Sequence, residues 1–213
     1  YATPAVTGVI ALIIEANPDL NPMQIKEVLK QTAERRGPAS NPTVDPYWNR
    51  DFGYGMVDAR AAVELAFHLA ETNQSASIDW TIQNHLLNVT NEGGTTTISG
   101  HAWTQSYVLA AVQYRIGDGT WKEATYEVVL EELGPLIPFN WTVALDLSSV
   151  PAGEQTVEIR AIRGAQQSLP VLVEVTGTDS SSASGLSMVL IIGGGLVLVG
   201  ILAAVIGFII MGQ

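Results

Sequence analysis

The pattern of apolar and polar positions changes character twice along the chain. Apolar residues recur at helical spacing in the first part, alternate with polar residues through the middle, and run almost unbroken near the end. We therefore expect a multi-part fold. It comprises a helical segment over residues 1–72, an all-β domain over 75–176, a Ser/Gly-rich linker over 177–185 and a transmembrane helix over 186–211.

The first segment contains three predicted helices, and the first of them is apolar on nearly every side. Residues 5–16 have the composition of a helix buried in the middle of a sizeable domain. A second helix is predicted to begin after Asn21, with Pro22 in its first turn and Gln24 completing a capping box. A third is predicted over about 58–70. Three helices of this kind cannot bury one another alone, so we expect the chain to be a fragment that lacks a covering sheet.

Period-two alternation in residues 75–176 predicts antiparallel strands with one buried face. In residues 139–146, Phe, Trp, Val and Leu alternate with Asn, Thr, Ala and Asp. Gly117-Asp118-Gly119 has the residues that a tight hairpin turn requires. About seven short strands in about 100 residues predict a β-sandwich. The stretch is similar to the Ig-like or fibronectin-like repeats that follow secreted bacterial and archaeal hydrolases.

Four tryptophans leave the role of this β domain open. Indole rings either fill a sandwich core or line a sugar-binding site, and the core is the commoner use. The domain is accordingly expected to be a spacer, with a carbohydrate- or protein-binding module as the alternative. The four residues are Trp80, Trp103, Trp121 and Trp141.

The final apolar run has the length of a membrane span. Residues 186–211 contain no charged side chain, and about 25 residues in a helix cover ~37 Å, more than the ~30 Å hydrocarbon core of a bilayer. A buried core helix of this length would carry a polar stripe. Membrane lipid is therefore the expected partner of this segment. No Lys or Arg flanks it, so charge does not set its orientation.

Three glycosylation sequons place the bulk of the chain outside the cell. Their acceptor residues are Asn73, Asn88 and Asn140, and only Gly212 and Gln213 follow the apolar run. No signal peptide is recognisable, so we expect that an N-terminal part has been lost. The predicted localisation is the cell membrane, single-pass, with the domains facing the extracellular side.

Charge and composition exclude several kinds of site. The net charge is −11, and such an acidic surface repels nucleic-acid phosphates, so no nucleic-acid partner is expected. The absence of cysteine excludes disulfides, thiolate metal sites and cysteine nucleophiles. No calcium loop of recognisable spacing occurs, so no metal site and no cofactor is expected in this chain. The oligomeric state is left open.

Four short motifs follow one another in residues 1–66. They are Tyr1-Ala2-Thr3-Pro4-Ala5-Val6-Thr7-Gly8, then Ala11-Leu12 with Asn17-Pro18, then Asn21-Pro22-Met23-Gln24-Ile25-Lys26, and finally Gly53-Tyr54-Gly55-Met56-Val57-Asp58-Ala59 with Ala62-Val63. In this order they resemble the closing segment of the subtilisin-like serine proteases, the subtilase family. Ala5, Thr7 and Asn21 depart from the family's frequent His, Ala and Thr, and none of these positions is catalytic in the family.

The resemblance implies acyl transfer by a Ser-His-Asp triad, with no catalytic residue inside this chain. The serine would immediately precede Tyr1, and the family's Asp, His and oxyanion-hole Asn would lie further upstream. Tyr1, Ala2, Thr3 and Pro4 would then adjoin the active site. A buried helix would point its N-terminus at the reaction centre, where its free N–H groups favour the developing oxyanion. Calcium is left open for the upstream part.

The leading hypothesis is a fragment of a membrane-anchored, extracellular subtilisin-like serine endopeptidase. Its polypeptide substrates would bind in a cleft built mostly upstream, so the fragment alone is expected to be inactive. The alternative is a non-catalytic cell-surface protein, in which an Ig-like module and an anchor follow a degenerate protease remnant. The histidines are expected to be structural or to lie on the surface. They are His68, His85 and His101.

Overall fold

Three helices form the N-terminal part of the computed structural model, which describes residues 2–177 and 190–192. They are α1 (Ala2–Ala16), α2 (Pro22–Thr32) and α3 (Ala59–Glu71). The predicted capping box of α2 is confirmed. The Asn21 side chain accepts the N–H groups of Met23 and Gln24, both at 3.0 Å, and the Gln24 side chain accepts the N–H of Asn21 at 2.8 Å. Asp58 caps α3 by accepting the N–H of Ala61.

Helix α1 is apolar on nearly every side, but the described residues bury only one side of it. Val9, Ile13 and Ala16 belong to a buried cluster shared with α3. Leu12 and Ile14, on its other sides, are 48% and 46% exposed. A helix of this composition is normally covered on every side, and the described strands do not supply that cover.

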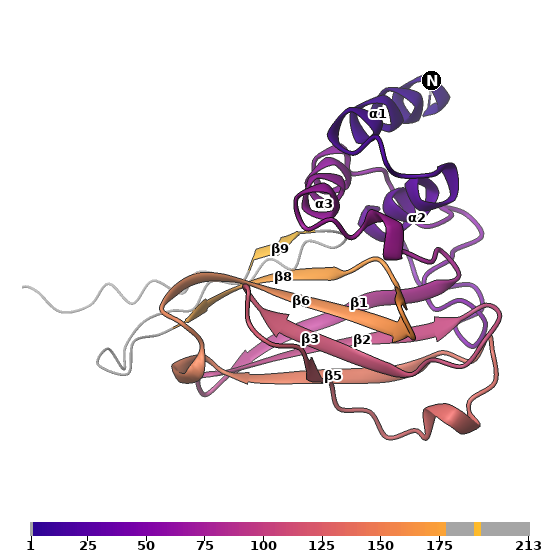
Figure 1. The fold of residues 1–213 in the computed structure, drawn as a ribbon. Helices are drawn as coiled ribbons and strands as arrows, with labels where there is room; N and C mark the ends of the chain where they lie inside the picture. Colours follow the sequence, from indigo (N-terminus) through magenta and orange to yellow (C-terminus); the bar gives the residue numbers. More distant parts are fainter. Residues whose placement is uncertain (1, 178–189, 193–213) are drawn as a thin grey trace, which may run out of the picture.

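In the described part of the chain, nine strands form two antiparallel sheets (Figure 1). The three-stranded sheet has the order β1-β2-β5, and the six-stranded sheet has the order β4-β3-β6-β8-β9, with β7 paired to β6. The predicted alternation of β5 is confirmed, since its residues are alternately buried and more exposed. The strands are β1 (Ile82–Glu92), β2 (Thr95–Thr104), β3 (Ala111–Ile116), β4 (Lys122–Glu123), β5 (Phe139–Asp146), β6 (Gly153–Arg163), β7 (Gln166–Gln167), β8 (Val171–Gly177) and β9 (Leu190–Ile192).

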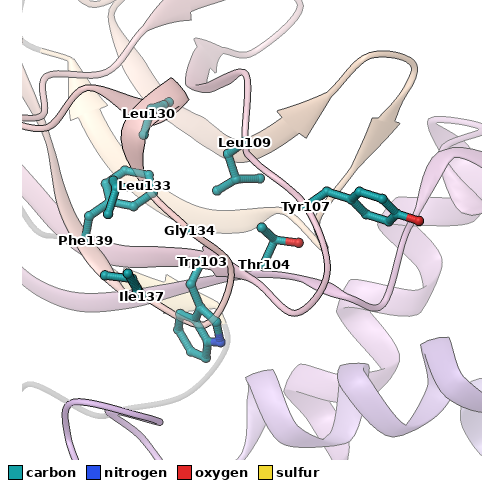
Figure 2. A pocket seen from close by; sticks show the side chains of 9 residues that line it. All are labelled: Trp103, Thr104, Tyr107, Leu109, Leu130, Leu133, Gly134, Ile137 and Phe139. Atoms are coloured by element: carbon teal, nitrogen blue, oxygen red, sulfur yellow. The ribbon is translucent and has the colours of Figure 1, made fainter.

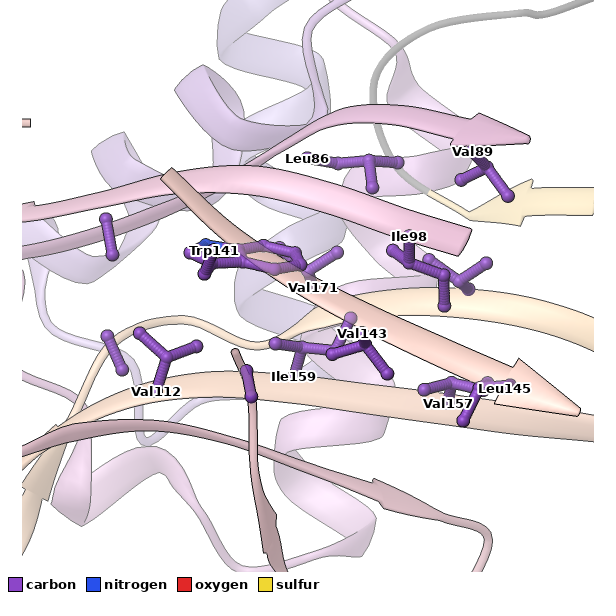
Figure 3. Close-up of a cluster of buried hydrophobic side chains, with 14 of the residues drawn as sticks. Leu86, Val89, Ile98, Val112, Trp141, Val143, Leu145, Val157, Ile159 and Val171 are labelled. Atoms are coloured by element: carbon purple, nitrogen blue, oxygen red, sulfur yellow. The ribbon is translucent and has the colours of Figure 1, made fainter. Parts of the chain in front are cut away.

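The two sheets enclose one apolar core around Trp141 (Figure 3). Trp141 is fully buried, together with Ile98 from the same sheet and Val157 from the other. Gly100 lies directly against the indole ring, because a Cβ at this position would come within 2.2 Å of Trp141 Cζ2 and 2.3 Å of the His85 carbonyl oxygen. Only glycine allows this close approach. The expected core role of Trp141 is confirmed.

A second apolar cluster joins the helices to the six-stranded sheet. Leu172 on β8, and Leu169 just before that strand, are buried in the same cluster as the inward faces of all three helices. Gln31 on α2 donates a hydrogen bond to the carbonyl of Pro170 at 2.6 Å. Figure 1 shows the three helices gathered at one side of the sheets. The helices and the sheets therefore share a core.

The predicted multi-part fold class is wrong. The described residues form a small β-rich domain of three helices and two antiparallel sheets, instead of a helical remnant, a self-contained Ig-like sandwich and a transmembrane helix. The physical reason is that the six-stranded sheet buries apolar side chains against the helices as well as against the other sheet. The sequence pattern of each segment by itself does not reveal this shared burial.

The predicted membrane span also needs correction where the structure describes it. Residues 190–192 form β9, which pairs with β8 in antiparallel register, Leu172 opposite Ile192. In residues 2–177 and 190–192, no helix is long and apolar enough to cross a membrane. The rest of the predicted span, and the predicted linker after residue 177, lie outside the described residues.

Candidate functional site

The residues predicted to adjoin an active site lie at the start of α1. Tyr1 is outside the described residues, and Ala2 is the first residue of the helix. Thr3 and Pro4 are exposed, and the Thr3 carbonyl accepts a hydrogen bond from the Thr7 hydroxyl at 3.0 Å. The N–H groups of a first helical turn have no acceptor within the helix. This end of α1 can therefore donate hydrogen bonds to a group placed beside it.

All three sequon asparagines are exposed. Asn73 follows α3 with a positive φ of 53°. Asn88 follows an irregularity in the pairing of β1 at Leu87, and Asn140 lies on the more exposed face of β5. Each side chain is accessible, and their glycosylation stays a prediction.

A buried polar cluster fastens the loop between α2 and α3 to β1 and β2. The Tyr47 hydroxyl lies 2.9 Å from Nδ1 of His101 and donates to the His85 carbonyl at 3.2 Å. The Tyr47 ring stacks on Trp103 with centroids 6.0 Å apart, and the Arg35 guanidinium carbon lies 3.5 Å from the centre of the same ring. We call these five residues the Tyr47 cluster. They attach an irregular loop to the sheet through ring stacking, a cation–π contact and hydrogen bonds.

Burial keeps the titratable side chains of the Tyr47 cluster neutral, except for Arg35. It raises the pKa of Tyr47 to about 12. Burial and the nearby charge of Arg35 lower the pKa of His101, and they lower the pKa of His85 well below its ordinary value. Both imidazoles are therefore neutral at pH 7. They pack and form hydrogen bonds, in line with the structural role expected for them.

A second buried polar cluster surrounds Glu158 on β6. Arg115 on β3 donates to its carboxylate through two nitrogens, at 2.8 and 2.6 Å, and Gln74 donates at 2.7 Å. His68 on α3 brings its Nε2 to 3.6 Å from the same carboxylate. Burial by itself would raise the pKa of Glu158, but the contacts from His68, Gln74 and Arg115 outweigh it and lower the pKa to about 2. The buried charge is thus fully engaged, and it joins α3 to the six-stranded sheet.

Neither cluster was predicted, because their members are far apart in the sequence. The partners Tyr47 and His101 are separated by 54 residues, and Gln74 and Glu158 by 84. No local spacing marks such pairs. Across residues 2–177 and 190–192, no group of three or more acidic or histidine side chains could hold a metal ion. We assign both clusters to holding the fold together.

Two adjoining hollows lie beside β5. The smaller one has a cavity volume of only about 10 Å³ and is lined mainly by apolar side chains from β2, β5 and two loops (Figure 2). The larger one, of about 590 Å³, is open to solvent. Leu133, Ile137 and Phe139 line both hollows, so the two lie side by side, and together we call them the β5 groove. Trp103 and Tyr107 also line the smaller hollow, and Tyr126, Glu127 and Asn140 also line the larger one.

Three of the tryptophans lie in three different environments. Trp141 is in the core, while Trp103 is 5% exposed and stacks on Tyr47 and His85. Trp121 lies beside two guanidinium groups, 4.7 Å from Arg115 and 3.6 Å from Arg160. These rings do not form one exposed row, so their arrangement gives no support to a tryptophan-lined sugar site.

Comparison with known proteins bears on the first segment. Residues 1–55 match the model of the subtilase family (Peptidase_S8). The predicted resemblance to the subtilases is therefore confirmed over this part of the chain. No curated protein matches the chain. Among solved structures, it is similar to the endo-beta-1,4-mannanase from Thermotoga petrophila, with 16% identity and a TM-score of 0.30, over 68% of this chain and 30% of that one. The chain thus spans less than a third of that mannanase.

Proposed function

We propose that this chain is the closing part of a subtilisin-like serine endopeptidase that hydrolyses peptide bonds in polypeptide substrates. The observation that carries the proposal is the family match over residues 1–55. The exposed apolar sides of α1 support it, because a protease domain completed upstream would cover them. The Ser-His-Asp triad would lie before Tyr1, with the serine immediately preceding it.

In this proposal the chain's own contribution is electrostatic. The first-turn N–H groups and the dipole of α1 favour negative charge at its N-terminus. Directed at the reacting carbonyl oxygen, donors of this kind contribute about 3 kcal/mol in a transition state. Pro4 lacks an N–H, which costs little in a first turn. Proton transfer is left to the upstream residues, and both an extracellular location and upstream calcium stay predictions.

The test compares this chain with the longer protein that includes the residues before Tyr1. Leu12→Asp should change the free energy of unfolding of this chain by less than about 0.5 kcal/mol, because Leu12 is half exposed here. In the longer protein it should abolish casein cleavage and labelling by a fluorophosphonate, because the new charge would be buried in the completed domain. Lys26→Asp, at an exposed position on α2, is the matched control. It should leave both casein cleavage and fluorophosphonate labelling of the longer protein intact.

The fluorophosphonate also identifies the nucleophile. Labelling of the longer protein should disappear when the residue before Tyr1 is replaced by Ala. The residue before Tyr1 could be something other than Ser, and the longer protein could be inert to the fluorophosphonate. Together these results would favour the alternative, a non-catalytic surface protein with a degenerate protease remnant. Peptide cleavage by this chain alone, blocked by the same probe, would contradict the proposal.

A further inference from the structure

Exposed apolar side chains line the β5 groove and lie next to its lining residues in the sequence. Tyr107 and Ile137, which line it, are 60% and 50% exposed. Leu136 and Val129, next to lining residues in the sequence, are 53% and 56% exposed. Single exposed apolar residues are ordinary on protein surfaces, but a group of them around one hollow indicates a binding surface. The walls of the groove are therefore suited to apolar side chains of a partner.

The wall that carries Leu136 and Ile137 is held in one conformation. Pro135 and Pro138 flank these two residues and restrict the backbone. Leu136 has a φ of 63°, a left-handed conformation that leucine rarely adopts, and its N–H donates to the Thr104 carbonyl at 2.8 Å. Backbone strain of this kind often accompanies function. A wall already ordered in the free protein also loses less entropy on binding.

The rim of the groove is acidic. Glu127 lines it, and Glu131 and Glu132 are exposed on the short helical turn that leads into its wall. Residues 123–159 contain no Lys or Arg. Carboxylates without a cation nearby in the sequence attract basic side chains and disfavour acidic ones.

One cation does approach the other end of the groove. The Arg163 guanidinium carbon lies 4.1 Å from the centre of the Tyr107 ring. Arg163 also forms an ion pair with Asp79, with 2.9 Å between nitrogen and oxygen, so its charge is compensated. The uncompensated acidic side chains are therefore on the Glu127 side.

The edge of β5 offers backbone groups to a partner. Thr125 and Thr142 exchange two N–H···O hydrogen bonds of 2.8 Å, which directs the N–H and C=O of Thr142 away from β2. The alternation of an antiparallel ladder directs those of Asn140 to the same side, along the groove. The N–H and C=O of Thr142 are bonded to Thr125, and Pro138 has no N–H, so Asn140 is the residue of this stretch whose main-chain groups can pair with an extended peptide. Side chains of such a peptide would lie in the larger hollow.

We propose that the β5 groove binds an extended polypeptide segment that carries basic and apolar side chains. A polysaccharide fits less well, because two of the aromatic rings, Trp103 and Phe139, are only 5% and 6% exposed and present no free face. The inference goes beyond the proposed protease function and does not depend on it, since binding needs no catalytic residue. A glycan on Asn140 would occupy the groove, so glycosylation there and peptide binding exclude each other.

The test measures peptide binding to the full chain, produced in a host without N-glycosylation. The probes are two fluorescein-labelled decapeptides, one alternating Lys and Val and the other alternating Glu and Val, followed by fluorescence anisotropy. The Lys peptide should bind at least about tenfold more tightly at low salt, because the rim is acidic. Ile137→Ser should weaken its binding about tenfold through loss of the apolar wall. Glu131→Lys with Glu132→Lys should also weaken it, with a smaller effect at high salt.

Matched controls lie on the far strand of the same sheet. Leu87→Ser removes an equally exposed apolar side chain from β1, and Glu92→Lys reverses an exposed charge at the end of that strand. Both should leave the affinity unchanged. Equal affinity for the two peptides, or unchanged affinity in Ile137→Ser, would overturn the proposal. So would binding of a β-1,4-linked hexasaccharide that Ile137→Ser weakens, in the absence of peptide binding.

Discussion

At the scale of single residues, Glu158 is a buried charge whose value to the fold can be measured. Glu158→Gln keeps the shape but leaves Arg115 without its ionic partner, and the loss of a buried pair costs about 3 kcal/mol of unfolding free energy. In the wild type, the contribution of the Glu158 carboxylate to the free energy of unfolding is fully present above the ordinary carboxyl pKa of 4.5. It is lost as the pH falls toward about 2, because only the unfolded state takes up the proton over this range.

Urea unfolding followed by tryptophan fluorescence at pH 7, 4 and 3 checks this prediction. Glu158→Gln should be less stable at pH 7 and should lose less stability than wild type on acidification. Glu154→Gln, exposed on the same strand, is the control and should behave like wild type. Equal stability of Glu158→Gln and wild type at pH 7 would show that the ion pair does not support the fold.

At the scale of elements, the loop between α2 and α3 depends on the sheet beneath it. His85 and His101 have lowered pKa values in the folded protein, so below about pH 6.5 the unfolded chain binds protons that the folded protein does not. The stability that the two neutral histidines confer should therefore be fully present above that pH and should fall as the pH drops from 7 to 5. The free energy of unfolding should fall by at most about 1.4 kcal/mol per pH unit for each histidine.

The double variant His85→Gln with His101→Gln tests this slope separately from overall stability. Denaturant titrations at each pH give the free energy of unfolding. In the double variant this free energy should change less between pH 7 and 5 than in wild type, whatever its value at pH 7. Asn88→Gln, at an exposed position on β1, is the control and should keep the wild-type dependence on pH. An unchanged slope in the double variant would mean that these two histidines do not carry the pH dependence. The range from pH 7 to 5 lies above the titration of Glu158, so the loss of stability caused by the histidines is separate from the loss caused by Glu158.

At the scale of the whole molecule, the shared apolar cluster predicts that helices and sheets unfold together. Leu172→Ala, on β8, removes a side chain that is 5% exposed and packs in the same cluster as the helices. It should lower the unfolding free energy by about 2–5 kcal/mol. Native-state hydrogen exchange should show equal losses of protection in α2, α3, β6 and β8.

The matched control for this prediction is Leu87→Ala, which removes an exposed leucine from β1. It should change the opening free energies measured by hydrogen exchange by less than about 0.5 kcal/mol. Loss of protection in the helices alone, with β6 and β8 unchanged in Leu172→Ala, would mean that the helices form a separate cooperative unit. The shared core would then not couple the two layers.

Local features of this protein were determined by the sequence itself. The capping box at Asn21, the cap at Asp58 and the alternation of β5 depend on residues a few positions apart, so periodicity and capping rules predict them. The resemblance of residues 1–55 to the subtilases was also recognisable, because its motifs are short and ordered. The open sides of α1 agree with the expectation from composition alone that this helix needs a partner layer.

Only the tertiary structure decided how these pieces combine. Tyr47 meets His101, Gln74 meets Glu158, and the helices share a core with Leu172, through contacts between residues far apart in the chain. Residues 190–192 have the composition of a membrane span, yet they pair with β8, since strand pairing depends on an available sheet edge as well as on hydropathy. The β5 groove likewise arises where separate loops meet one strand. Burial and long-range pairing are properties of the assembled chain, and no local pattern encodes them.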